Sequence, residues 1–127
     1  MEQRWRYSRS RHPPFPVLTL SVEGFSIEAA VDTGFDGGVL IPFPLFSSLG
    51  LMKTLSEDEF HLGLPDSRKV SLYSSRRVIR VGGMDVEAYI HSSSEVRRKV
   101  VGRELLGPFT TTLDGRKEEL TLEAPPH

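Results

Sequence analysis

The strongest constraint on the fold is a pattern of short apolar–polar alternation interrupted by turn residues. Apolar residues alternate with polar ones over residues 17–22 and again over residues 25–31, with Glu23-Gly24 between the two runs. Alternation with a period of two is typical of a strand that buries one face. A short Gly-containing connection between two such runs is typical of antiparallel neighbours. The pattern therefore predicts a β-hairpin that begins after Pro16.

Turn residues also separate the alternating runs further along the chain. Gly82-Gly83 separates two further alternating runs, and Leu113-Asp114-Gly115-Arg116 is a strong hairpin signal. Residues 42–50 combine proline in a first turn with a final Gly50, which is typical of a brief helix. Many short strands, frequent turns and one short helix predict an all-β domain, either a small barrel or a pair of orthogonal sheets.

A chain of 127 residues is long enough for one domain with its own core. Residues 1–14 are polar, rich in Arg and end in Pro13-Pro14, so we expect a basic, irregular N-terminal arm. The domain itself is expected over residues 15–123. Residues 124–127 contain two prolines and are expected to form a short tail that cannot continue a central strand.

Composition excludes several classes of site. The absence of cysteine removes disulfides, thiolate nucleophiles and zinc–thiolate sites, and it suits a reducing compartment. A formal net charge of −1 gives no general attraction to nucleic acid or to anionic membranes. No run is long and apolar enough to span a bilayer, and the N-terminus lacks the apolar core of a signal peptide. We therefore expect a soluble, cytoplasmic protein with no membrane partner.

Most familiar catalytic motifs are also missing. The sequence has no His-Glu-x-x-His, no phosphate-binding Gly-rich loop followed by Lys, and no Gly-x-Ser-x-Gly. The histidines His12, His61, His91 and His127 lie far apart and are expected to be surface or partly packed residues. No metal or organic cofactor is expected.

One carboxylate stands out. The strand over residues 25–31 runs into Asp32-Thr33-Gly34, and the chain resumes as the apolar Val39-Leu40-Ile41. Side chains alternate between faces of a strand, so Asp32 leaves the strand opposite the core set. Because Ala29-Ala30-Val31 is apolar on both faces, the carboxylate is expected at the edge of a covered region. These residues alone leave two interpretations open, a turn residue and a catalyst.

Two motifs in order resemble those of the retropepsin-like aspartic proteases, the single-lobed family that includes the retroviral proteases. The first is Ala30-Val31-Asp32-Thr33-Gly34 with the apolar strand after it. The second is Val100-Val101-Gly102-Arg103-Glu104-Leu105-Leu106, about seventy residues further on. The resemblance spans residues 17–122 and is closest to prokaryotic members. It implies a small closed β-barrel with one or two short helices. The second motif also echoes residues 31–34, which suggests an internal two-fold.

The resemblance implies an aspartic endopeptidase that cleaves extended or unfolded polypeptide. Such enzymes use two carboxylates that share one proton. One acts as general base on a water, and the other hydrogen-bonds the scissile carbonyl. This chain has a single Asp-Thr-Gly, so the resemblance implies a homodimer with one catalytic Asp32 from each subunit.

The resemblance also assigns neighbouring roles. Thr33 and Gly34 would support the catalytic loop, Thr33 by hydrogen-bonding across the dimer. Asp36 and Arg103 would form a structural ion pair near the site. Residues 60–72 would form the flap that covers the substrate. The candidate substrate-binding residues of flap and pocket are Phe35, Ile41, Leu62, Gly63, Leu64 and Pro65.

Two rival functions remain. The first is a non-catalytic dimeric module of the same fold that binds peptides without cutting them. The second is a nucleic-acid contact through Arg4-Trp5-Arg6-Tyr7, where Arg and aromatic residues interleave as in single-strand binders. A solvated arm is the simpler interpretation of that stretch, so nucleic acid is not an expected partner.

Overall fold

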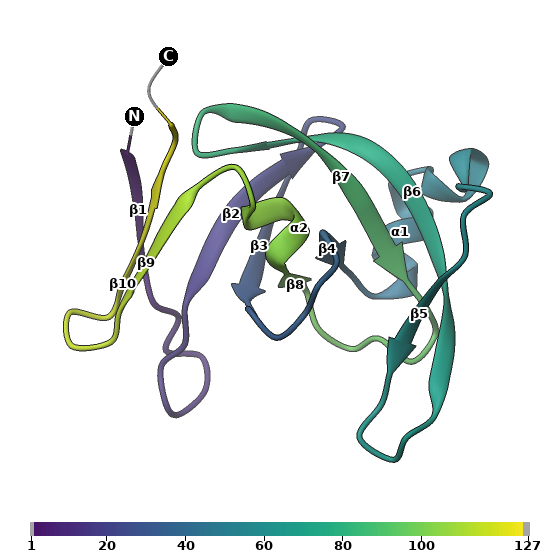
Figure 1. The fold of residues 1–127 in the computed structure, drawn as a ribbon, viewed down its shortest axis with the longest axis horizontal. Coiled ribbons are helices and arrows are strands. Elements are labelled where there is room, and N and C mark those ends of the chain that lie inside the picture. Colours follow the sequence, from purple (N-terminus) through teal and green to yellow (C-terminus); the bar gives the residue numbers. More distant parts are fainter. Residues whose placement is uncertain (1, 126–127) are drawn as a thin grey trace.

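The computed structural model describes residues 2–125, and its architecture is almost entirely β (Figure 1). The elements in chain order are β1 (Glu2–Arg6), β2 (Val17–Val22), β3 (Phe25–Val31), β4 (Val39–Leu40), α1 (Phe43–Ser48), the 3-10 helix η1 (Leu51–Thr54), β5 (Phe60–Gly63), β6 (Lys69–Val81), β7 (Met84–Ser92), β8 (Val100–Val101), α2 (Arg103–Leu106), β9 (Thr110–Asp114) and β10 (Glu119–Glu123). None of the helices in this part of the chain is long and apolar enough to cross a membrane.

The strands form two sheets. The larger has the order β2-β3-β8-β4-β7-β6-β5, and an additional pairing of β2 with β6 closes it on itself. The smaller has the order β1-β10-β9 and lies beside it (Figure 1). The predicted small closed barrel with short helices is confirmed.

The first hairpin forms as its turn chemistry predicts. β2 and β3 pair from Val17↔Ala30 to Val22↔Phe25. Glu23 and Gly24 have φ values of 50° and 80°. Positive φ at both central residues is the turn geometry that matches the twist of paired strands. The turn therefore determines which side chains of β2 and β3 share a face of the sheet, in agreement with the alternation in the sequence.

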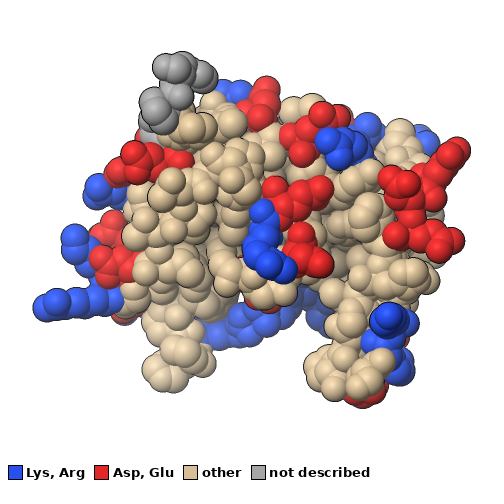
Figure 2. Space-filling model, viewed as in Figure 1, with Lys and Arg blue, Asp and Glu red and all other residues tan. Residues whose placement is uncertain are grey.

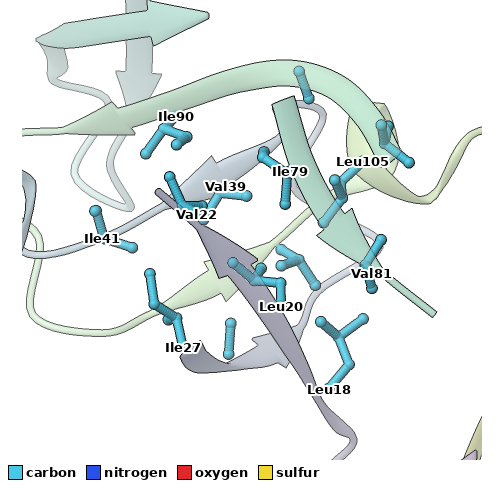
Figure 3. Packing of buried hydrophobic residues seen from close by; sticks show 14 of the residues in the cluster. Leu18, Leu20, Val22, Ile27, Val39, Ile41, Ile79, Val81, Ile90 and Leu105 are labelled. Atoms are coloured by element: carbon cyan, nitrogen blue, oxygen red, sulfur yellow. The ribbon is translucent and has the colours of Figure 1, made fainter. Parts of the chain in front are cut away.

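The core fills the interior of the barrel (Figure 3). Its side chains come from both halves of the chain, and the buried members labelled in the figure converge on one another. They include Leu18, Leu20, Val22, Ile27, Val39, Ile41, Ile79, Val81, Ile90 and Leu105. Non-directional burial of this kind is the main favourable term in folding, and it holds the strand ends beside the candidate site in place.

The barrel has an internal two-fold. β3 pairs in parallel with β8, β4 pairs in parallel with β7, and β4 and β8 pair antiparallel. Exchanging β3–β4 with β7–β8 reproduces these three pairings, and each half ends in a short helix. The predicted echo matches the segment that begins at residue 100 with residues 31–34, and this match is wrong. The strand register instead makes residues 100–101 equivalent to residues 39–40. By the same register the internal counterpart of Asp32 is Ser92.

The prediction of an irregular arm is wrong for its first residues. Residues 2–6 form β1, which pairs with β10 in the register Trp5↔Leu120. Trp5 and Tyr7 pack against the main core, so the alternation of Arg and aromatic residues is the period of a half-buried strand. Of the predicted tail, residues 124–125 lie outside the strands, and residues 126–127 lie outside the described residues.

The β5–β6 hairpin extends beyond the barrel at the lower right of Figure 1. Its strands pair from Phe60↔Leu72 to Gly63↔Lys69. At the tip, the Leu64 N–H donates to the Arg68 carbonyl at 2.9 Å. This hairpin occupies residues 60–72, the segment predicted as a flap, with its turn at residues 64–68.

Candidate active site

Asp32 follows β3 directly and is held by its backbone. Its N–H donates to the Val101 carbonyl at 3.0 Å, and its carbonyl accepts the Phe35 N–H at 3.1 Å. Its Oδ1 accepts the Gly34 N–H at 2.9 Å. The turn and the carboxylate are therefore one unit, because the side chain caps the turn that presents it. Asp32, with Gly34, is exposed in the single chain rather than at a covered edge.

The segment that follows β8 clamps the loop that follows Asp32. The N–H groups of residues 102, 103 and 104 donate to the carbonyls of Gly38, Phe35 and Gly37 at 2.9, 2.9 and 3.1 Å. A Cβ on Gly102 would lie 2.5 Å from the Gly37 carbonyl oxygen, so only glycine permits this approach. The two sequence motifs are thus in direct contact.

The ion pair expected between Asp36 and Arg103 is not formed among the described residues. Arg103 instead engages the loop through its backbone N–H, which donates to the Phe35 carbonyl. Both side chains are exposed, and an exposed pair gains little free energy over hydration. Asp36 lies close enough to His91 to influence its titration.

A groove of about 310 Å³ runs between Asp32 and the β5–β6 hairpin. Figure 2 shows the molecule hollowed along its lower edge, between this hairpin and the rest of the chain. The lining residues are Asp32, Gly34, Phe35, Leu40, Leu62, Gly63 and Val100. The structure therefore brings the predicted Phe35, Leu62 and Gly63 together with the carboxylate.

Three other predicted residues lie elsewhere. Ile41 is fully buried in the main core, so its assignment to the pocket is wrong. Strand parity explains the error, because Leu40 points to the opposite face from Val39 and Ile41 and lines the groove instead. Leu64 and Pro65 form the turn of the hairpin and are not among the groove-lining residues.

Thr33 is exposed at the same surface. Its hydroxyl makes no hydrogen bond to another described residue. The role across a dimer therefore stays a prediction for this residue.

Phe35 ties the hairpin to the floor of the groove. It packs with Leu62 and Leu72 of the hairpin against a small cluster formed by Leu40, Val96 and Val100. A large aromatic here fills space that a small residue would leave open. The hairpin base is thereby attached to the loop that carries Asp32.

His91 is a buried residue that the sequence did not reveal. It is only 3% exposed, so the expectation of a surface or partly packed residue is wrong here. Its Nδ1 lies 2.6 Å from the Ser74 hydroxyl, and its ring packs edge-on to Phe35 and Phe60. Burial lowers the pKa of His91 to about 4, and Asp36 opposes this in part. The ring is therefore neutral at neutral pH and acts as a wall beside the loop.

No group of three or more potential metal ligands gathers within residues 2–125.

Solved structures share this architecture. A retropepsin-like aspartic protease from Rickettsia conorii superposes with a TM-score of 0.70 at 16% sequence identity, covering 96% of this chain and 90% of that one. The EIAV protease complexed with the inhibitor HBY-793 superposes with a TM-score of 0.58 at 15% identity, covering 76% of this chain and 89% of that one. The chain has the retropepsin-like fold. No protein-family model matches the sequence, and no curated protein matches it.

Within this retropepsin-like fold the internal two-fold does not duplicate the carboxylate. Ser92, the counterpart of Asp32, is fully buried, and its hydroxyl donates to the Ile41 carbonyl at 2.6 Å. A buried neutral hydroxyl already committed to a backbone carbonyl cannot act as a second acid or base. One chain therefore offers a single exposed carboxylate in the groove.

Proposed function

We propose that this protein is an aspartic endopeptidase that works as a homodimer, with Asp32 of each subunit forming the catalytic pair. The observation that carries the proposal is an exposed Asp32 in the groove under the β5–β6 hairpin, with a buried Ser92 at the equivalent position in the other half of the barrel. The second carboxylate then has to come from a second copy of the chain.

A two-fold axis between two Asp32 loops brings the carboxylates together. Like charges this close share one proton. The ionised carboxylate takes a proton from a water, whose oxygen attacks the scissile carbonyl carbon. The protonated one donates a hydrogen bond to the carbonyl oxygen as negative charge develops. The carbon–nitrogen bond then breaks as the leaving amine is protonated, and no covalent enzyme intermediate forms.

The groove suits an extended peptide with apolar side chains near the cleaved bond. Phe35, Leu40, Leu62 and Val100 supply apolar walls on both sides of Asp32. β5 is the terminal strand of the sheet order, so its outer edge is free to hydrogen-bond an added strand. Unfolded segments, with unpaired backbone groups, are the substrates that such an edge selects.

The test is cleavage of an unfolded protein at mildly acidic pH, with and without the inhibitor pepstatin. We expect cleavage by the wild type, inhibition by pepstatin, and a loss of about 10³-fold in Asp32→Asn, because amide cannot replace a carboxylate as general base. Asp85→Asn removes one exposed carboxylate at the far end of β7 and should retain activity. Equal behaviour of wild type and Asp32→Asn would instead favour the non-catalytic dimeric peptide-binding module.

A further inference from the structure

A second hollow of about 220 Å³ lies beside the groove, at the base of the β5–β6 hairpin. Its lining residues are Phe35, Asp36, Gly37, Phe60, His61, Leu72, His91 and Glu104. The hollow and the groove share Phe35. The hollow is therefore adjacent to the groove, and we call it the acidic–aromatic pocket.

The charge of the acidic–aromatic pocket has one sign. Its carboxylates come from Asp36 and Glu104, and neither Lys nor Arg is among its lining residues. His91 is neutral because burial lowers its pKa to about 4. Glu104 is half-buried and fixed, since its Oε1 accepts the Tyr89 N–H at 2.9 Å. Asp36 forms no ion pair with any described residue, so its charge is available to a ligand.

The remaining walls suit a flat cation. The rings of Phe60 and His91 lie with centroids 4.9 Å apart, and Phe35 closes the side toward Asp32. Aromatic faces attract cations, and a guanidinium binds carboxylate with two parallel hydrogen bonds. The pocket thus combines the two features that recognise a basic side chain.

We propose that the acidic–aromatic pocket selects substrates that carry Arg or Lys at a position flanking the cleaved bond, with Asp36 and Glu104 determining the selectivity. The inference rests on the proposed function and assigns the apolar groove to a different substrate residue. Arg is favoured over Lys, because its planar group can both stack on the rings and pair with a carboxylate.

The experiment uses short peptides of Leu and Ser that carry a single Arg at successive positions. Each peptide is matched by one with citrulline, which keeps the shape of Arg and removes its charge. At one position we expect kcat/KM to favour Arg over citrulline by about tenfold, which corresponds to one charge-assisted contact. Equal rates for Arg and citrulline at every position would overturn the inference.

Variants identify the residues responsible. We expect Asp36→Asn and Glu104→Gln each to lower the Arg-to-citrulline ratio several-fold, whereas Asp85→Asn leaves it unchanged. The ratio is measured within each protein, so partial loss of activity or of folded protein cancels. An unchanged ratio in both pocket variants would also contradict the inference.

A binding measurement separates this inference from the proposed function. Fluorescence anisotropy of the labelled peptides with Asp32→Asn needs no cleavage. We expect the favoured Arg peptide to bind about tenfold more tightly than its citrulline counterpart, with a difference that shrinks as salt is added. If the wild type cleaves nothing but this difference is seen, the proposed function fails and the pocket assignment stands. No difference in binding would overturn the pocket assignment.

Discussion

At the scale of single residues, Gly102 is the position where the two loops of the candidate site touch. It has an extended backbone with φ of −121°, so the requirement for glycine is one of space and not of conformation. Its N–H group and the next two N–H groups donate hydrogen bonds to carbonyls of the Asp32 loop. Loss of this contact loosens the loop that presents the carboxylate.

We predict that Gly102→Ala lowers the free energy of unfolding by about 1–3 kcal/mol, because the added methyl group forces backbone to move. Urea denaturation measures the change. Gly115→Ala is the matched control, since a Cβ there meets nothing within 4 Å. Equal stabilities of the two variants would show that the loops are not clamped as described.

His91 makes stability depend on pH. Its pKa is lowered in the folded protein to about 4 from 6.5. The contribution of His91 to the free energy of unfolding is fully present above pH 6.5. It is lost as the pH falls from 6.5 toward 4, because the unfolded chain takes up a proton on this residue before the folded chain does. The difference between the two pKa values corresponds to about 3 kcal/mol of the free energy of unfolding.

We therefore predict that the wild type loses more free energy of unfolding between pH 7 and pH 4 than His91→Gln does. Denaturation at several pH values gives the two slopes. His61→Gln changes an exposed histidine and should keep the wild-type slope. Parallel slopes for wild type and His91→Gln would contradict the burial of a neutral ring.

Sequence reasoning located the carboxylate and part of the groove but not the surroundings of His91. Asp32, Phe35 and Leu62 could be assigned to the groove because a sequence motif and the period of a strand indicate their positions. Leu40 was also within reach, since parity distinguishes it from Ile41. The burial of His91 depends on the register of β6 against β7, which pairs Ser74 with His91 across a long hairpin. No local pattern specifies that contact.

At the scale of elements, β1 is the strand that the sequence did not predict. Its partner β10 lies at the other end of the chain, with Trp5 opposite Leu120. The hairpins were predicted because their turn residues are adjacent in sequence. A pairing between distant segments leaves no such local signal, and the high Arg content suggested a solvated arm.

We predict that Trp5→Ala lowers the free energy of unfolding by about 2 kcal/mol, because Trp5 is half-buried against the main core. Arg4→Ala on the exposed face of the same strand should change it by less than about 0.5 kcal/mol. Urea denaturation of both variants provides the comparison. Similar values would mean that β1 is not packed as described.

In the whole molecule, the strands of the barrel have an internal two-fold arrangement, but the two halves carry different side chains at the equivalent position. Both halves use the same strand pairings. One half presents an exposed carboxylate and the other a buried serine hydroxyl. Under the proposed function, a second copy of the chain has to supply the other carboxylate.

Whether two chains make one active site is decided by measuring activity and association state over the same range of chain concentration. Sedimentation velocity gives the dimer fraction, and cleavage of an unfolded protein gives the activity per chain. We predict that activity per chain rises in proportion to the dimer fraction. Full activity from a chain that stays monomeric throughout would show that one chain makes a complete active site.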